Sequence, residues 1–283
     1  MADSDSILYE RPAENVARIV LNRAQARNAQ DTALLYALND AFDRAAGDDE
    51  VKVVILASTG PHFSAGHDLR ETDAVANMDA HRPVGTWGGT HARAAEARYA
   101  REMEIYLGFC ERWRALSKPT IAQVQGKCIA GGLMLVWPCD LVVASEDAEF
   151  LDNTVTMGAV GVEYFVHPWE MGARRAKEHL FTAEPIGARE ALSLGMVNRV
   201  VPREELAEAT LALASRIAQM PMLALKLTKE AVNNAQDAQG RVQSVRMAFA
   251  LHQLTHSHNE QVFGLPVDPT VMNPDFVRPA NKG

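Results

Sequence analysis

The feature that most constrains the fold of this chain is an almost unbroken run of β-branched and apolar residues at positions 51–57. Such a run is typical of a strand that is covered on both faces of a parallel sheet. A second apolar run, at 16–21, also predicts a strand. Between the two, Asp31 can cap a helix whose apolar residues recur at helical spacing up to Gly47. Strand, helix and strand in this order predict a parallel crossover and an α/β protein.

The alternation of strand and helix continues along the chain. Further strands are expected at 120–124, 128–130, 141–144, 148–150 and 196–201, and helices at 92–116, 133–137, 174–181 and 188–194. Pro138 predicts that the helix after Gly131 is short or kinked, because proline removes a backbone donor. The stretch 79–90 lacks periodicity and is rich in glycine, proline and histidine, which predicts a mobile loop or lid.

The pattern divides the chain into three parts. Residues 1–203 are expected to form the core, with a loop and helix insertion at about 72–118. Residues 204–258 are almost wholly helical but too polar to form a core alone, so this region is expected to pack on the core and on a neighbouring subunit. Residues 259–283 are expected to be an irregular tail.

Composition excludes several classes of function. The 283 residues are 47% apolar and 23% charged, as in ordinary globular proteins, and the net charge of −8 argues against nucleic-acid binding. No apolar run is long enough to cross a membrane, and the N-terminus has no secretory pattern, so a cytoplasmic protein is expected. The three cysteines match no metal or redox spacing and are expected to be small, buried side chains.

Two glycine-containing turns carry the clearest chemical signal. The first, at 64–67, and the second, at 130–132, each follow an expected strand. Glycine allows backbone N–H groups to approach a ligand closely, and two such groups directed at one oxygen stabilise a developing oxyanion. The spacing alone also fits two tight turns without a ligand.

Several motifs in register resemble the crotonase (enoyl-CoA hydratase/isomerase) superfamily over about residues 10 to 235. These motifs are Asn22-Arg23, Phe63-Ser-Ala-Gly-His-Asp-Leu69, Lys118-Pro-Thr-Ile-Ala122, Gln125-Gly126, Ala130-Gly-Gly132, Cys139-Asp-Leu-Val-Val-Ala144 and Ala188-Arg-Glu-Ala-Leu-Ser-Leu-Gly-Met-Val-Asn198. The resemblance implies the crotonase (ClpP-like) fold of repeated ββα units, with a C-terminal helical trimerisation region. It also implies an acyl-CoA thioester substrate, no separate cofactor, no metal, and a homotrimer or a dimer of trimers.

The resemblance assigns roles to particular positions. The N–H groups of His67 and Gly131 would form the oxyanion hole for the thioester carbonyl. Residues that would line the path of coenzyme A are Gln25, Ala26, Arg27, Ala65, Asp68 and Leu69. Arg23 or Arg27 is a candidate for a phosphate of coenzyme A, although a surface arginine is more often only solvated.

Two positions depart from the superfamily pattern. Hydratases of this superfamily carry one glutamate three residues after the oxyanion-hole glycine and a second in the segment after the Cys-Asp strand. Here the two positions are Met134 and Thr154. Neither side chain exchanges a proton near neutral pH, so hydration by the usual pair of carboxylates is not supported.

Other residues are candidates to replace those glutamates. Glu163 is the nearest carboxylate in sequence, and Tyr164 and His167 can donate hydrogen bonds; for Glu163 and His167 a structural or interface role is the alternative. Asp152 is a second candidate carboxylate, although as an exposed loop residue it would more often be solvated. The imidazole of His67 is a third candidate, because histidine titrates near physiological pH. The candidate catalytic residues are therefore His67, Gly131, Glu163 and Asp152, and Met134, Thr154 and Tyr164 are expected to face the substrate.

The resulting hypothesis is an acyl-CoA-acting enzyme of enoyl-CoA hydratase type, a lyase or isomerase. Decarboxylation, isomerisation and hydrolysis on the same fold remain alternatives, because the fold does not fix the reaction. A catalytically impaired acyl-CoA binding protein is an alternative of another class, motivated by the loss of both glutamates.

Overall fold

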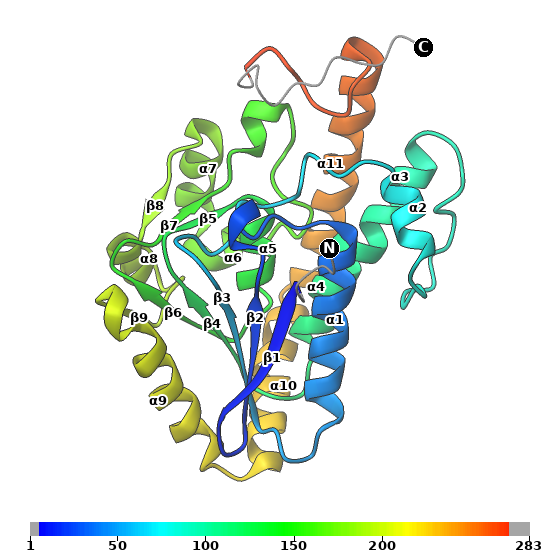
Figure 1. Cartoon of the computed structure of the whole chain (residues 1–283). Coiled ribbons are helices and arrows are strands. Elements are labelled where there is room, and N and C mark those ends of the chain that lie inside the picture. The colour runs from blue at the N-terminus through cyan, green and yellow to red at the C-terminus, as the bar shows by residue number, and fades with distance from the viewer. Residues whose placement is uncertain (1–5, 272–283) are drawn as a thin grey trace.

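A six-stranded sheet lies at the centre of the chain in a computed structural model that describes residues 6–271 (Figure 1). Its strand order is β1-β2-β3-β4-β6-β9. The six strands are β1 (Ile7–Ala13), β2 (Val16–Leu21), β3 (Val53–Ser58), β4 (Thr120–Val124), β6 (Leu141–Ser145) and β9 (Arg199–Val201). β1 and β2 are antiparallel, and the other neighbouring pairs are parallel.

A smaller three-stranded sheet and the helices complete the described part of the chain. The small sheet has the order β5 (Lys127–Ile129), β7 (Glu149–Leu151) and β8 (Ile186–Gly187). The α-helices are α1 (Thr32–Gly47), α2 (Ala74–Asp79), α3 (Ala95–Glu102), α4 (Phe109–Arg114), α5 (Gly131–Val136), α6 (His167–Met171), α7 (Ala173–Thr182), α8 (Ala188–Leu194), α9 (Leu206–Ala218), α10 (Met222–Ala238) and α11 (Arg241–Phe263). A π-helix spans Met103–Gly108, and short 3₁₀ turns span Ala24–Ala26, Thr154–Met157 and Arg203–Glu205.

The large sheet is covered on both faces, as the unbroken apolar run at 51–57 predicts. Val54 and Leu56 belong to the main core cluster with the apolar face of α1. Val53 and Ile55 point to the other face and join a second cluster with α9. Figure 1 shows α1 and α9 on opposite sides of the sheet. The mixed α/β class with a helical C-terminal region is therefore confirmed.

The first crossover has the predicted form. β2 pairs with β3 in parallel, and α1 connects them, with the Asp31 carboxylate accepting a hydrogen bond from the N–H of Leu34. β1 was not expected from the sequence, because its side chains are half-buried or exposed and include Glu10, Arg11 and Pro12. An edge strand of this kind lacks the apolar run that marks a central strand.

The predicted helix at 92–116 is present as a continuous helical segment over 95–114, but its middle is a π-helix. The chain forms α3, then the π-helix Met103–Gly108, and then α4, which ends at Arg114. A Cβ at position 108 would lie 2.5 Å from the carbonyl oxygen of Met103, so the glycine permits the wider turn. The segment 80–94 has no helix or strand, as expected for the loop at 79–90, and α2 precedes it within the insertion at about 72–118.

The C-terminal helices largely follow the predicted pattern. α9 packs on β3, β4 and β6, and α11 continues to Phe263, beyond the expected end of the helical region at 258. Part of the predicted irregular tail, residues 272–283, lies outside the described residues. α5 ends at Val136, just before Pro138, as predicted.

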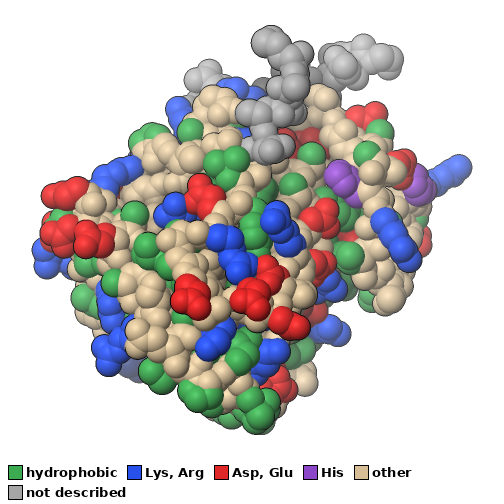
Figure 2. All heavy atoms as spheres, turned by 60° about the horizontal axis from the view of Figure 1, so that its bottom comes forward, with side chains coloured by type: hydrophobic (Ala, Val, Ile, Leu, Met, Phe, Trp, Pro, Cys, Tyr) green, Lys and Arg blue, Asp and Glu red, His purple; other side chains and the backbone are tan. Residues whose placement is uncertain are grey.

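The surface charges and the apolar character of the helices bear on the surroundings of the chain. On the face drawn in Figure 2, acidic and basic side chains are interspersed. Within residues 6–271, no helix combines the length and apolar character needed to cross a bilayer.

Candidate active site

The two glycine-containing turns lie against each other. Ser64 forms a bridge with Cys128 of β5, and the N–H of Ile129 donates to the carbonyl of Ser64 at 2.9 Å. Gly66 has a φ of +88°, and a Cβ there would lie 2.8 Å from the carbonyl oxygen of Ile129 and 3.1 Å from the nitrogen of Gly131. Glycine at this position is therefore required for the close approach of the two turns.

Two backbone N–H groups at this junction are left out of the local pairing. The N–H of Gln30 donates to the carbonyl of Gly66 and the N–H of Asp68 donates to the carbonyl of Gln30, both at 2.8 Å. These bonds flank His67, so its own N–H takes no part in the pairing. Gly131 is the first residue of α5, where an N–H has no partner within the helix. The turns thus offer two backbone donors, one from each turn.

The imidazole of His67 packs directly on Gly131. A Cβ at position 131 would lie 2.7 Å from both Cε1 and Nδ1 of the His67 ring. The ring also stacks on Tyr106 of the π-helix, with 3.9 Å between the ring centroids. Its Nε2 lies 3.2 Å from Oε2 of Glu163, and its Nδ1 is buried without a hydrogen-bond partner among the described residues. The structure therefore brings together His67, Gly131 and Glu163 from three separate segments.

The electrostatics of this group favour an ionised carboxylate and a neutral phenol. Burial alone would raise the pKa of Glu163, but the imidazoles of His67 and His252 outweigh it and hold this pKa well below its usual range. Burial raises the pKa of Tyr106 far above its usual range, with Arg101 opposing the shift only in part. Glu163 can consequently accept a hydrogen bond from the Nε2–H of His67, and Tyr106 stays protonated.

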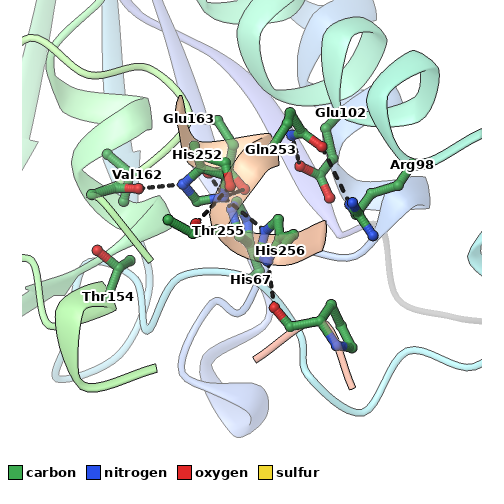
Figure 3. Close-up of polar contacts among 12 residues, drawn as sticks. His67, Arg98, Glu102, Thr154, Val162, Glu163, His252, Gln253, Thr255 and His256 are labelled. Carbon is green, nitrogen blue, oxygen red and sulfur yellow. Dashed lines mark hydrogen bonds and ion pairs between the residues drawn. The ribbon is translucent and has the colours of Figure 1, made fainter. Parts of the chain in front are cut away.

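Behind Glu163 lies a pair of histidines from α11 (Figure 3). Nε2 of His252 is 3.6 Å from Oε1 of Glu163 and 2.8 Å from Nε2 of His256. Neither histidine was expected at the site from the sequence, and neither was Tyr106. The spacing of four residues between His252 and His256, which places them on one face of a helix, was the available signal.

Asp152 corrects the expectation of an exposed loop residue, because it is fully buried. One oxygen accepts from the N–H and the hydroxyl of Thr154, and the other accepts from the N–H of Val162 and lies 2.9 Å from Nε2 of His167. Burial would raise the pKa of Asp152, but these bonds, led by that of His167, lower it to about 2. Asp152, Thr154 and His167 thus form a buried structural unit around the Glu163 loop (residues 158–166).

The other position where the resemblance led us to expect a glutamate is also buried. Met134 lies in the main core, 2% exposed, and its carbonyl accepts a hydrogen bond from the thiol of Cys110. Tyr164 is 1% exposed, and its hydroxyl accepts from Arg241 of α11 at 3.0 Å. It borders a cavity of about 200 Å³ together with Arg114 and Arg246, among others.

Asp68, one of the residues expected along the coenzyme A path, lines a second, larger cavity. Its volume is about 470 Å³, and Arg23, Asp68 and Arg70 are among the residues that line it. Arg23 is held by ion pairs to Asp31 at 2.7 Å and to Asp68 at 3.1 Å. Ala26 and Ala65 are partly exposed, and Gln25, Arg27 and Leu69 are exposed. This region is open to a ligand, although Arg23 already has two carboxylate partners.

Comparison with known proteins identifies the family. The sequence profile described as enoyl-CoA hydratase/isomerase matches residues 11–265. The putative enoyl-CoA hydratase EchA13 of Mycobacterium tuberculosis is 46% identical over 254 residues, which cover 88% of this chain and 80% of that protein.

The chain belongs to the enoyl-CoA hydratase/isomerase family.

Solved structures of the enoyl-CoA hydratase/isomerase family have the same fold. A probable enoyl-CoA hydratase from Mycobacterium smegmatis is 46% identical, with a TM-score of 0.84 over 93% of this chain and 99% of that one. A probable enoyl-CoA hydratase from Mycobacterium thermoresistibile is 45% identical, with a TM-score of 0.85 over 94% and 100% of the two chains. A monofunctional enoyl-CoA isomerase from M. smegmatis is 26% identical, with a TM-score of 0.66 over 85% and 99%. The crotonase fold is therefore shown, while family membership leaves the reaction open between these classes.

Proposed function

We propose that this chain is an enoyl-CoA hydratase-like enzyme that transfers a proton next to the carbonyl of an acyl-CoA thioester. The N–H groups of His67 and Gly131 hold the carbonyl oxygen and stabilise the enolate, which forms when the neighbouring carbon loses a proton and is consumed when this carbon regains one. His67 and Glu163 act in place of the two glutamates that the superfamily pattern leads one to expect at Met134 and Thr154.

One observation carries this proposal: the His67 imidazole lies on Gly131 with one nitrogen bound to Glu163 and the other unpaired. An ionised Glu163 accepts the Nε2–H of His67 and so selects the tautomer in which Nδ1 carries a lone pair. This is the way a buried carboxylate orients a catalytic histidine in hydrolases. Nδ1 is then the proton acceptor beside the proposed oxyanion hole.

The assignment leaves the other candidates with different roles. Asp152, Thr154 and His167 support the Glu163 loop through the buried bonds described above. Met134 forms part of the core wall. Coenzyme A is part of the substrate in this proposal, its path follows the 470 Å³ cavity near Asp68, and no separate cofactor is needed.

A panel of acyl-CoA esters tests the function. The purified chain is incubated with enoyl-, malonyl- and hydroxyacyl-CoA esters, and products are followed by mass spectrometry. We expect turnover of an enoyl-CoA or hydroxyacyl-CoA ester, and a decrease of roughly 10²- to 10⁴-fold in Glu163→Gln, because general acid–base groups contribute rate factors of that size. Binding of the ester should change little. The matched control is Glu96→Gln, which alters an exposed glutamate of α3.

Other results of this panel would lead to different conclusions about the reaction. Unchanged turnover in Glu163→Gln would remove this carboxylate from the mechanism. Tight ester binding without turnover of any ester in the panel would instead identify a catalytically impaired acyl-CoA binding protein. Loss of carbon dioxide from a malonyl-CoA ester, or release of free coenzyme A, would assign the chain to decarboxylation or hydrolysis.

A further inference from the structure

Four metal-ligating side chains converge next to the proposed active site. They are Glu102 at the end of α3, Glu163 in its loop, and His252 and His256 on one face of α11. One ligand atom from each lies within 4.8 Å of the others (Figure 3). Glu102, Glu163 and His252 are only 3 to 4% exposed. We call these four residues the His–Glu cluster.

The two histidines are oriented by bonds on their far side. Nδ1 of His252 faces the carbonyl of Gly161 at 2.5 Å, and Nδ1 of His256 faces the carbonyl of Pro266 at 2.5 Å. A carbonyl oxygen only accepts, so each Nδ1 carries the hydrogen and each Nε2 of a neutral ring presents a lone pair. Metal-bound histidines in proteins are usually oriented by the same kind of N–H bond to a carbonyl.

The facing Nε2 atoms require a positive charge between them. They are 2.8 Å apart, and two lone pairs at this distance repel unless a proton or a metal ion lies between the rings. A shared proton would make one ring a buried imidazolium.

Two buried carboxylates, those of Glu102 and Glu163, lie next to the two histidine rings. Their negative charges favour more than one positive charge in this cluster. Oε2 of Glu163 bonds to His67, which leaves Oε1 directed at His252. Glu102 accepts a hydrogen bond from Gln253 at 2.5 Å and has Arg101 at 3.4 Å from its other oxygen. Buried carboxylates are strongly destabilising unless cations compensate them, and Arg101 supplies only one charge.

We propose that the His–Glu cluster binds one divalent transition-metal ion of the zinc class. Tetrahedral zinc with bonds of about 2.0 to 2.2 Å places its ligand atoms roughly 3.3 Å apart. The separations of 2.8 Å between the two Nε2 atoms and 3.6 Å between His252 and Glu163 lie on either side of that value. Imidazole and carboxylate ligands without a thiolate suit zinc, manganese and ferrous iron. The bonds of Glu163 to His67 and of Glu102 to Gln253 would orient the carboxylates as an outer shell.

Zinc binding is measured directly on the full chain. After removal of metal with a chelator, the protein is titrated with zinc chloride by calorimetry, and bound metal is counted by mass spectrometry after gel filtration. We expect one equivalent per chain. We also expect a thermal midpoint that rises with zinc concentration, because an ion that binds only the folded state stabilises it.

Variants locate the site. His252→Gln and His256→Gln should each lower zinc affinity by more than about 100-fold, because each removes a ligand atom. Glu102→Gln should also lower it. The matched control is His258→Gln, the same substitution at an exposed histidine of the same helix, which should bind zinc like the unaltered chain. Near-UV circular dichroism of the metal-free variants shows whether the fold is retained.

Metal binding by the unaltered protein also tests the proposal. The metal site can therefore be tested even if a variant misfolds. Cobalt substituted for zinc should give the visible absorption of a tetrahedral nitrogen and oxygen site. The absence of saturable binding of zinc and cobalt by the unaltered chain would overturn the metal site and assign a shared proton to His252 and His256. Equal loss in His258→Gln and His252→Gln would also overturn it. None of these readouts uses acyl-CoA turnover, so the result is independent of the proposed reaction.

Discussion

The absence of a side chain at position 131 keeps the His67 ring in place. In Gly131→Ala, the new Cβ would lie 2.7 Å from Cε1 and Nδ1 of His67 and 3.1 Å from Oε1 of Gln30. The ring must move, and the N–H of residue 131 moves with α5. We expect a loss of roughly 10²- to 10³-fold in turnover of the acyl-CoA ester identified by the panel, as when one oxyanion donor is removed. Steady-state kinetics measures this loss.

Gly47→Ala is the control for that substitution, because nothing lies within 4 Å of a Cβ at position 47. Its turnover should equal that of the unaltered protein. Full activity in Gly131→Ala, with the thermal midpoint unchanged, would show that the His67 ring does not need its place on Gly131.

Asp152 should make the free energy of unfolding depend on pH under acidic conditions. Its pKa falls from 3.8 to about 2 on folding, so the carboxylate contributes about 2 kcal/mol to the free energy of unfolding above about pH 4. This contribution is lost as the pH falls from about 4 to 2, because a lowered pKa stabilises only the ionised form. In Asp152→Asn, urea unfolding should show lower stability at neutral pH and a weaker pH dependence between pH 2 and 4. The exposed Asp49→Asn is the control, and an unaltered pH dependence under acidic conditions in Asp152→Asn would contradict the assignment.

Among the single elements, the π-helix Met103–Gly108 determines how Tyr106 meets His67. Gly108→Ala places a methyl group 2.5 Å from the carbonyl oxygen of Met103, which the wide turn cannot accommodate without a shift. We expect the free energy of unfolding to fall by about 1 to 3 kcal/mol, the usual effect of overpacking. Urea unfolding measures it, with Gly47→Ala again as the control. A stability equal to that of the control would mean that the segment relaxes to an ordinary α-helix at no cost.

The spacing of apolar residues in the sequence predicted those helices and strands in which apolar residues recur at a regular interval. It failed for elements whose structure depends on contacts with distant parts of the chain. β2, α1 and α8 have clear periodicity and appear at or within one residue of the expected bounds. β1 and the π-helix depend on pairing and packing that no short window of sequence contains. In the site, the motifs located the two turns and singled out Glu163. His252 follows Glu163 only after some ninety residues, so its approach depends on the packing of α11.

At the scale of the whole molecule, the outer faces of α10 and α11 predict self-association. Their exposed apolar side chains include Leu223, Leu227, Val232, Met247, Leu251 and Leu254. Apolar patches of this kind mark interfaces, and the crotonase resemblance implies a trimer. Light scattering after gel filtration should give a mass that is a multiple of three chains of 31.0 kDa.

Substitution within this face tests which surface is buried. Leu227→Glu should lower the mass toward that of one chain, whereas Leu192→Glu, at an exposed leucine of α8, should not. A single-chain mass for the unaltered protein would refute the trimer.

The position of α11 in the chain has a consequence for biosynthesis. Both turns and Glu163 leave the ribosome before His252 and His256 are made, so a nascent chain can form the sheet while Glu163 still lacks the helix behind it. Until α11 is made, the Glu163 carboxylate lacks its partner His252. The loop that carries Glu163 should therefore remain open to proteases during this time. Ribosome-bound chains arrested before residue 241 should therefore be cleaved in the segment 158–166, and chains that include α11 should be protected there.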